Sequence, residues 1–301
     1  MAIAIFALGL AFGSFLNVCI YRLPRGISVI HPGSACPNCE SQIHFYDNVP
    51  VLSWFILRGR CRQCQERISP RYFVIELLTG GLFLFCYAEF GLTLSMLKCC
   101  IFGFLLLGLI FTDAETQLLP DKLTITGLIL GLGLSLFVPV NDIVSQFLPA
   151  LVSPEATSAW RLWSLLDAIA GAAVGASFIY GAGAIYLRAR GVEGMGFGDV
   201  KLMAMIGAFV GIRLTILTIF AASIAGSLFG LWALLAIWAK RTHRRMLRNH
   251  ESRSEARRRA WTSAAIALRH LPMPFGVFLG SMAMLAFLYG NRFLRWYWRL
   301  F

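Results

Sequence analysis

Four cysteines form two closely spaced pairs early in the chain. Cys36 and Cys39 frame one Cys-x-x-Cys pair, and Cys61 and Cys64 frame the second. Each pair is typical of a tight turn whose two thiolates converge on one ion, and two such turns complete a tetrahedral sulfur site. The spacing therefore predicts a structural zinc site, which would fold a loop too small to have a core of its own.

Two aspartates lie beside apolar segments and suggest a different chemistry. Asp113 follows directly after a long apolar run, and Asp199 ends the sequence Gly196-Phe197-Gly198-Asp199 before another apolar run. Two carboxyls that lie close together in a site of low polarity share one proton, because both cannot ionise at low cost. Such a pair can activate water and polarise a carbonyl group, which is the chemistry of an aspartic protease.

Other roles for the acidic residues stay open at this point. Asp199 can cap the helix that follows it, because a carboxylate accepts hydrogen bonds from the free backbone N–H groups of a helix N-terminus. Asp121 is better placed as a cap than as a catalyst. Paired carboxyls can also carry protons in an ion-coupled transporter. Lys201 would favour an ionised Asp199 if the two side chains are close, and it can equally be a membrane-interface anchor.

The composition shows which elements must position these residues. Hydrophobic residues make up 58% of the 301 residues and charged residues 14%, with a mean hydropathy of +0.70. Soluble domains are usually about 45–50% apolar and about 25% charged. This excess of apolar residues excludes an ordinary soluble enzyme, a disordered chain and a disulfide-stapled secreted scaffold. We predict an all-α polytopic membrane protein.

Eight apolar segments are candidates for membrane crossing, because a crossing helix needs about 20 mostly apolar residues. They are 2–20, 72–90, 93–112, 123–140, 166–187, 200–212, 214–238 and 272–290. The sixth is short enough to be a half-helix or a re-entrant piece, and only Gly211-Ile212-Arg213 separates it from the seventh. Small residues four apart, at Gly171/Gly175 and Gly226/Gly230, are typical of close helix packing.

Charge predicts the orientation of these segments. The net charge is +12, and basic residues collect in cytoplasmic loops. Eight crossings with an outer N-terminus place most of the Lys and Arg residues inside, in the regions 21–71, 113–122, 188–199 and 240–271. Asp113 and Asp199 then lie at the same cytoplasmic face, whereas Asp142 and Asp167 fall on the outer side. In this reducing compartment, disulfides between the four cysteines are not expected.

These motifs resemble those of the type IV prepilin peptidase family. The sequence ending at Asp199 resembles the GxGD motif of membrane aspartyl proteases, and the remaining motifs follow in the family's order over most of the chain. They are Gly13-Ser14-Phe15-Leu16-Asn17-Val18 with Arg22-Leu23-Pro24, both cysteine pairs, Asn48-Val49-Pro50 with Leu52-Ser53, Gly59-Arg60-Cys61, Asp113 through Leu118-Leu119-Pro120-Asp121, and Pro274-Phe275-Gly276. Val277 stands where the family commonly has a second proline, and we expect little consequence from it.

The resemblance implies a bifunctional enzyme of the bacterial inner membrane. Members of the family remove the short basic leader of type IV prepilins or type II secretion pseudopilins at the cytoplasmic face. They then typically methylate the new N-terminal residue, often Phe, with S-adenosylmethionine as the methyl donor. The resemblance assigns catalysis to Asp113 and Asp199, and it links Gly59 to methylation. It also assigns the family's cysteine motif to Cys36, Cys39, Cys61 and Cys64.

The expected organisation has three parts. Residues 1–20 form a first transmembrane helix, residues 21–71 a cytoplasmic zinc loop linked to the methyltransferase, and residues 72–301 the transmembrane aspartyl peptidase core. The core contains a basic loop at 240–271, which we interpret as a solvated helix resting on anionic lipid, worth about 1 kcal/mol per basic residue near the surface. Nucleic-acid binding is not expected, because this loop has one aromatic residue, Trp261, and no fold of its own.

Three alternatives to the bifunctional enzyme remain from the sequence. One is a peptidase without methyltransferase activity, because no glycine-rich nucleotide fingerprint is visible. Another is an ion-coupled transporter, which predicts carboxyls near the membrane midplane and inverted repeats. The paired aspartates instead lie at segment ends, and no repeat is apparent. The third alternative is a non-enzymatic scaffold held together by zinc.

Overall fold

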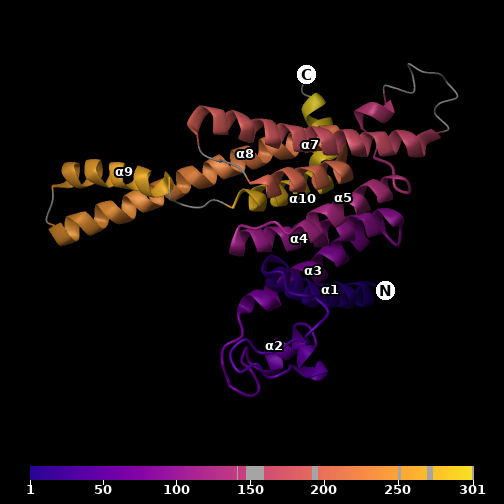
Figure 1. Ribbon diagram of the computed structural model, residues 1–301, viewed down its shortest axis with the longest axis horizontal. Helices are drawn as coiled ribbons and strands as arrows, with labels where there is room; N and C mark the ends of the chain where they lie inside the picture. The colour runs from indigo at the N-terminus through magenta and orange to yellow at the C-terminus, as the bar shows by residue number, and fades with distance from the viewer. Residues whose placement is uncertain (141, 147–158, 192–195, 250–251, 270–273, 300–301) are drawn as a thin grey trace.

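A computed structural model describes residues 1–140, 142–146, 159–191, 196–249, 252–269 and 274–299. Within these residues the chain is a bundle of long helices, and two isolated β-bridges stand in place of any strand (Figure 1). The helices are α1 (Ala2–Arg22), α2 (Leu52–Ile56), α3 (Pro70–Phe90), α4 (Leu94–Thr116), α5 (Asp121–Ser135), α7 (Trp160–Arg190), α8 (Phe197–Asn249), α9 (Arg253–Arg269) and α10 (Phe275–Trp298). The prediction of an all-α fold is confirmed.

Six helices in the described residues are long and apolar enough to cross a membrane by length and composition: α1, α3, α4, α7, α8 and α10. The difference from the eight predicted segments has two causes. Segment 123–140 folds as α5, whose 15 residues extend about 22 Å, less than a hydrocarbon core of about 30 Å. Segments 200–212 and 214–238 both belong to α8.

Helix α8 reverses its direction at Gly211. This residue has φ +80° and ψ −177°, which are not helical values. A methyl group in place of the Gly175 hydrogen on α7 would lie 2.6 Å from the Met203 carbonyl oxygen and 3.1 Å from Thr215 Cγ2. Because residues on both sides of the break meet the same glycine of α7, the two arms of α8, 197–210 and 212–249, run antiparallel. The predicted break between the sixth and seventh segments is confirmed.

Glycines let α7 and the first arm of α8 approach closely. A methyl group at Gly171 would lie only 2.4 Å from the carbonyl oxygen of Gly207, so the two backbones are almost in contact there. The predicted packing role is confirmed for Gly171 and Gly175. At Gly226 the nearest atom to such a methyl group is 3.8 Å away, on Phe278, which is an ordinary contact.

The main apolar core lies between α4, the first arm of α8 and α10. Phe102 of α4 stacks on Phe209 of α8, with ring centroids 4.6 Å apart. Leu279 and Ala283 of α10 are buried in the same cluster. Packing along this core brings the end of α4, the start of α8 and the start of α10 to one end of the bundle, where the candidate catalytic residues lie.

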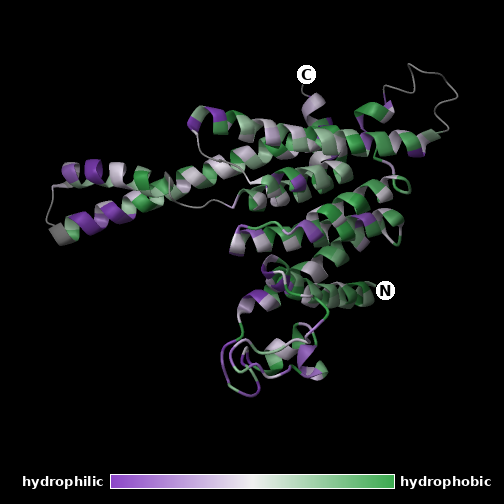
Figure 2. Ribbon diagram, in the orientation of Figure 1, coloured by the Kyte–Doolittle hydropathy of each residue, from purple (hydrophilic) through white to green (hydrophobic). Residues whose placement is uncertain are grey.

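The second arm of α8 extends beyond the bundle, and α9 folds back along it (Figure 1). Figure 2 shows that hydrophilic residues gather on these two helices and around α2, whereas the bundle helices are largely apolar. Ala256, Ala260 and Ala264 of α9 are buried. The predicted basic loop at 240–271 is therefore mainly a helical hairpin, as far as its residues are described.

Candidate active site and metal centre

The four cysteine sulfurs of the first loop converge on one point. All four lie within 4.8 Å of one another. The Sγ atoms of Cys36 and Cys64 are 3.7 Å apart, and those of Cys39 and Cys61 are 4.0 Å apart. Four thiolates at about 2.3 Å from a tetrahedral zinc ion are separated by about 3.8 Å, whereas a disulfide needs about 2.05 Å. The group is therefore able to hold a metal ion, as the spacing predicted.

Both cysteine turns fold in the same way. The Glu40 N–H donates to the Cys36 carbonyl at 2.9 Å, and the Gln65 N–H donates to the Cys61 carbonyl at 3.1 Å. Glu40 and Gln65 both take a positive φ, of 56° and 58°. Each turn thus closes on the residue after its second cysteine, which directs the two sulfurs of each pair to the same side.

Polar groups beside two of the four sulfurs, those of Cys39 and Cys61, favour thiolates. The Ser41 hydroxyl lies 2.9 Å from Cys39 Sγ, and this hydrogen bond lowers the pKa of the Cys39 thiol to about 6. The backbone N–H of Cys64 lowers the pKa of the Cys61 thiol. Because the thiolate is the form that binds metal, these contacts prepare the site for a cation.

The two aspartates paired by the sequence analysis come together at one end of the bundle. Asp113 is buried near the end of α4, and Asp199 is half-buried in the first turn of α8. They are close enough for the charge of Asp113 to act on the Asp199 carboxyl. A methyl group at Gly198 would lie 3.1 Å from Leu119 Cβ, so the start of α8 rests against the segment that follows α4.

The start of α10 completes the surroundings of Asp113. The Val277 N–H donates to Asp113 Oδ2 at 3.0 Å, from the first turn of the helix. A helix N-terminus stabilises a carboxylate through its free N–H groups and dipole. A methyl group at Gly276 would lie 2.8 Å from the same oxygen. Proline has no N–H, so Val277 makes a hydrogen bond that the family's common residue could not make.

The cation nearest to Asp199 in sequence has another partner. Lys201 Nζ lies 2.6 Å from Asp121 Oδ1 at the start of α5. Pro120 is the N-cap of α5, so Asp121 does not cap that helix but instead ties it to α8. Lys201 therefore joins two helices beside the site, and its charge is balanced by Asp121.

Gly59 lies just before the second cysteine pair and packs against an indole ring. Its φ is +65°, and a methyl group there would lie 3.1 Å from Cζ2 of Trp54. The Gly59 N–H donates to the Trp54 carbonyl at 2.8 Å. Backbone conformation and space both account for a glycine at this position, and its link to methylation stays a proposal.

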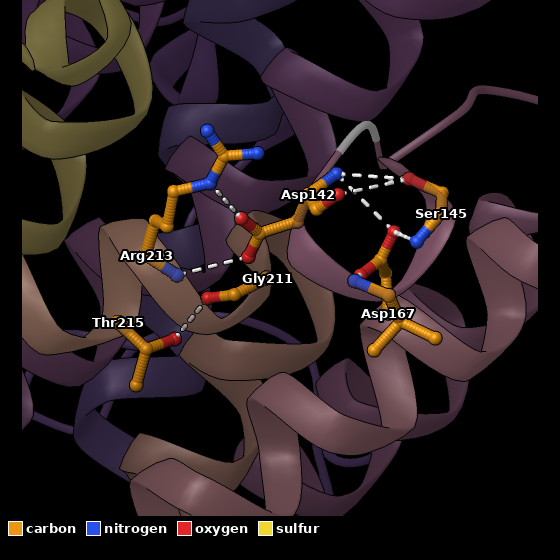
Figure 3. Close-up of polar contacts among 7 residues, drawn as sticks. Asp142, Ser145, Asp167, Gly211, Arg213 and Thr215 are labelled. Atoms are coloured by element: carbon orange, nitrogen blue, oxygen red, sulfur yellow. Dashed lines mark hydrogen bonds and ion pairs between the residues drawn. The ribbon is translucent and has the colours of Figure 1, made fainter. Parts of the chain in front are cut away.

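A polar cluster that was not predicted from the sequence lies at the far end of the first arm of α8, around Gly211 (Figure 3). At about 1.5 Å per residue, Gly211 is about 18 Å along the helix from Asp199. Asp142 accepts hydrogen bonds from the Arg213 backbone N–H at 2.9 Å and from Arg213 Nε at 2.5 Å. Asp167 accepts from the backbone N–H groups of Asp142, Val144 and Ser145, at 3.2, 2.8 and 3.0 Å. Asp142 thus satisfies a backbone N–H just after the reversal of α8, whereas Asp167 satisfies backbone N–H groups of the segment 142–145.

Gly211 is required by this cluster. Its positive φ disfavours other residues, and a methyl group there would lie 2.5 Å from Asp142 Oδ2. From the sequence, Asp142 and Asp167 were expected on the outer side, with no functional role. The sequence feature that could have pointed to this cluster is Arg213, two residues after the break, because an arginine inside a membrane protein needs a counter-charge.

Comparisons with known proteins agree with this architecture. Residues 7–90 match the bacterial peptidase A24 N-terminal domain, and residues 100–231 match the type IV leader peptidase family. No solved structure matches the chain.

Several relatives carry the name prepilin leader peptidase/N-methyltransferase. The protein from Aeromonas salmonicida is 30% identical over 97% of this chain and 92% of its own length. That from Neisseria gonorrhoeae is 35% identical over 73% of this chain and 77% of its own length. That from Myxococcus xanthus is 38% identical over 78% of this chain, and the match spans 64% of its length.

These matches run through both cysteine pairs and both aspartates, and the long apolar helices make the chain a multi-pass membrane protein. The chain belongs to the type IV leader peptidase family.

Proposed function

We infer that this protein is a prepilin leader peptidase that also N-methylates the new N-terminus of its product. Relatives with that name cover most of the chain. The observation that carries the peptidase assignment is the convergence of Asp113 and Asp199 at adjoining helix ends, with the start of α10 bound to Asp113.

We assign hydrolysis to these two carboxyls. One of them, ionised, takes a proton from a water molecule, while the other, protonated, donates a hydrogen bond to the scissile carbonyl oxygen. Water then attacks the carbonyl carbon without a covalent enzyme intermediate. The Val277 N–H holds one oxygen of Asp113, so the carboxyl keeps a single orientation during this exchange.

The position of the pair suits a substrate with a membrane helix. Asp113 ends one apolar helix, and Asp199 begins another. A prepilin whose apolar segment stays in the lipid would present its scissile bond at this interface, without leaving the membrane. We place the protein in the bacterial inner membrane with this end facing the cytoplasm, which agrees with the excess of basic residues in the loops on that side. Pseudopilins of type II secretion fit the same description.

We propose that the cysteine loop, residues 21–71, binds structural zinc through Cys36, Cys39, Cys61 and Cys64. The sulfur separations and the donors beside the thiolates support this choice of metal. Zinc would hold the loop in one conformation. The loop itself precedes the proposed peptidase core, residues 72–301.

We propose S-adenosylmethionine as the methyl donor, bound where the cysteine loop meets the bundle. Trp54 of the loop stacks on Phe73 of α3 with ring centroids 5.3 Å apart. The Trp54 Nε1 atom is buried and has no hydrogen-bond partner among the described residues. Aromatic faces bind cations, and a free N–H needs an acceptor, so these groups suit a donor with a sulfonium centre. When bound, the donor supplies the methyl group.

The experiment that tests this function uses purified full-length protein in detergent, S-adenosylmethionine and a synthetic prepilin peptide. Mass spectrometry should detect the cleaved peptide first and then its singly methylated form. Cleavage without methylation would support the peptidase-only alternative. No cleavage of any prepilin or pseudopilin peptide by folded protein would overturn the assignment.

A further inference from the structure

A further buried acidic side chain, separate from the two aspartates, lies on α3. Glu76 belongs to α3, a helix long and apolar enough to cross a membrane, and the residue is only 8% exposed. Its Oε2 atom accepts a hydrogen bond from the Val51 backbone N–H at 2.7 Å. A carboxyl this well buried is rare in a membrane protein and calls for a functional explanation.

The segment that Glu76 contacts is strained. Val51 immediately precedes α2 and takes φ +63° and ψ −53°. A positive φ is a genuine outlier for a β-branched residue, and such conformations cluster at functional sites, where the surrounding structure holds them in place. The buried carboxylate of Glu76 thus fixes a strained residue of the cysteine loop against the membrane helices.

An unused acceptor lies in the same layer of the bundle. Asn17 of α1 is 3% exposed, and its Nδ2 donates to the Tyr72 carbonyl at 3.0 Å. Its Oδ1 atom is buried and receives no hydrogen bond from the residues that the structure describes. A methyl group at Gly13, one helical turn before Asn17, would lie 2.7 Å from Glu76 Cα. The close packing of α1 on α3 therefore places Asn17 and Glu76 near each other.

The acceptors at this site need a donor group. A carboxylate offers about four lone-pair positions, of which the Val51 N–H uses one. Within the described residues, no Lys or Arg forms a salt bridge with Glu76. A primary ammonium group carries three N–H donors and a positive charge, so it would satisfy both the carboxylate and the Asn17 oxygen.

This site and the aspartate pair share one end of the bundle. Arg71, in the first turns of α3, pairs with Glu115, two residues after Asp113. Helix α1 packs on both α3 and α4. A new peptide N-terminus released beside Asp113 on α4 would therefore stay within the group formed by α1, α3 and α4 on its way to Glu76.

We propose that Glu76 and Asn17 form the subsite for the α-ammonium group of the cleaved pilin, and this rests on the proposed methyltransferase function. The Glu76 carboxylate holds the ammonium and then accepts the proton that its nitrogen must lose before methylation. In that step one N–H bond of the substrate breaks and one O–H bond forms on Glu76.

The test is Glu76→Gln in the full-length protein. Glutamine keeps the size of the side chain and an oxygen that can accept from Val51, so a merely structural role survives the change. Glu89→Gln, on the same helix and paired with Arg292, is the matched control. Leader cleavage and metal content should stay as in the wild type in both variants. Methylation should fall about 10- to 100-fold in Glu76→Gln only, because a charge-assisted hydrogen bond is lost.

A binding measurement makes the test independent of methyl transfer. Fluorescence anisotropy would compare a labelled mature-pilin peptide that starts with a free amine with its N-acetylated form. Wild-type protein should bind the free amine more tightly, and Glu76→Gln should lose this preference. Unchanged methylation, unchanged amine preference, or loss of cleavage together with methylation would each overturn the subsite. A wild type that cleaves, prefers the free amine and yet does not methylate would contradict the proposed transferase while leaving the subsite supported.

Discussion

Replacing Gly276 with alanine should displace the carboxyl of Asp113. Gly276 lies in the first turn of α10, where an added methyl group would be 2.8 Å from Asp113 Oδ2 and 3.0 Å from its Cγ. Ordinary contact begins at about 3.4 Å, so the carboxyl or the helix must move by about 0.6 Å. The hydrogen bond from Val277, now 3.0 Å, would lengthen with that movement.

The expected effect on cleavage follows from this displacement. A misplacement of about 1 Å at a reacting group can cost about 100-fold in rate. A shift of about 0.6 Å should therefore lower the rate constant for cleavage by about 10- to 100-fold, or about 1.4–2.7 kcal/mol in activation free energy. The fold should persist, because alanine favours a helix over glycine by about 1 kcal/mol.

The assay is single-turnover cleavage of a prepilin peptide, followed by mass spectrometry, with thermal unfolding measured in parallel. Gly280→Ala, one turn further along α10, is the matched control, because its methyl group would meet the side-chain end of Ile110 instead of a carboxyl. Gly181→Ala, whose added methyl group would meet nothing within 4 Å among the described residues, controls for the substitution itself. Wild-type cleavage by folded Gly276→Ala protein would refute the placement of α10 against Asp113.

Three further predictions concern the other sites. Cys61→Ser should reduce metal content from about one zinc per chain to a small fraction, because one of four thiolates is lost; retention of stoichiometric metal by atomic absorption would contradict the site. Gly59→Ala should reduce methylation more than cleavage, because its positive φ and the contact with Trp54 both resist a methyl group; equal losses in the two assays would argue against that role. Asp142→Ala should lower the free energy of unfolding by about 1–2 kcal/mol, because the backbone N–H and the partly exposed side chain of Arg213 lose their hydrogen-bond acceptor; an unchanged thermal unfolding curve in detergent would count against this.

The sequence predicted those features whose signal is local. The cysteine site follows from spacing alone, because each pair makes its own turn. The reversal in α8 follows from a short apolar run that ends at Gly211 with an arginine close behind. The pairing of Asp113 with Asp199 needed only the order of the apolar segments, which places both residues at the same face.

Contacts between distant residues could not be read from the sequence. The hydrogen bond from Val277 to Asp113 spans 164 positions, and it depends on how α10 packs against α4. The contact of Glu76 with Val51 likewise depends on the way the cysteine loop folds back onto α3. The length of α8 was underestimated, because the basic residues that follow its apolar run are themselves good helix formers.

The catalytic role of the two carboxyls is tested by comparing Asp113→Asn, Asp199→Asn and Asp121→Asn in a prepilin cleavage assay with purified protein. Asparagine keeps the size of each side chain but removes the acid, and Asp121, paired with Lys201 nearby, is the matched control. Cleavage should be abolished in the first two variants and stay within a few-fold of wild type in the third. Cleavage retained by either Asp113→Asn or Asp199→Asn would contradict the aspartyl pair.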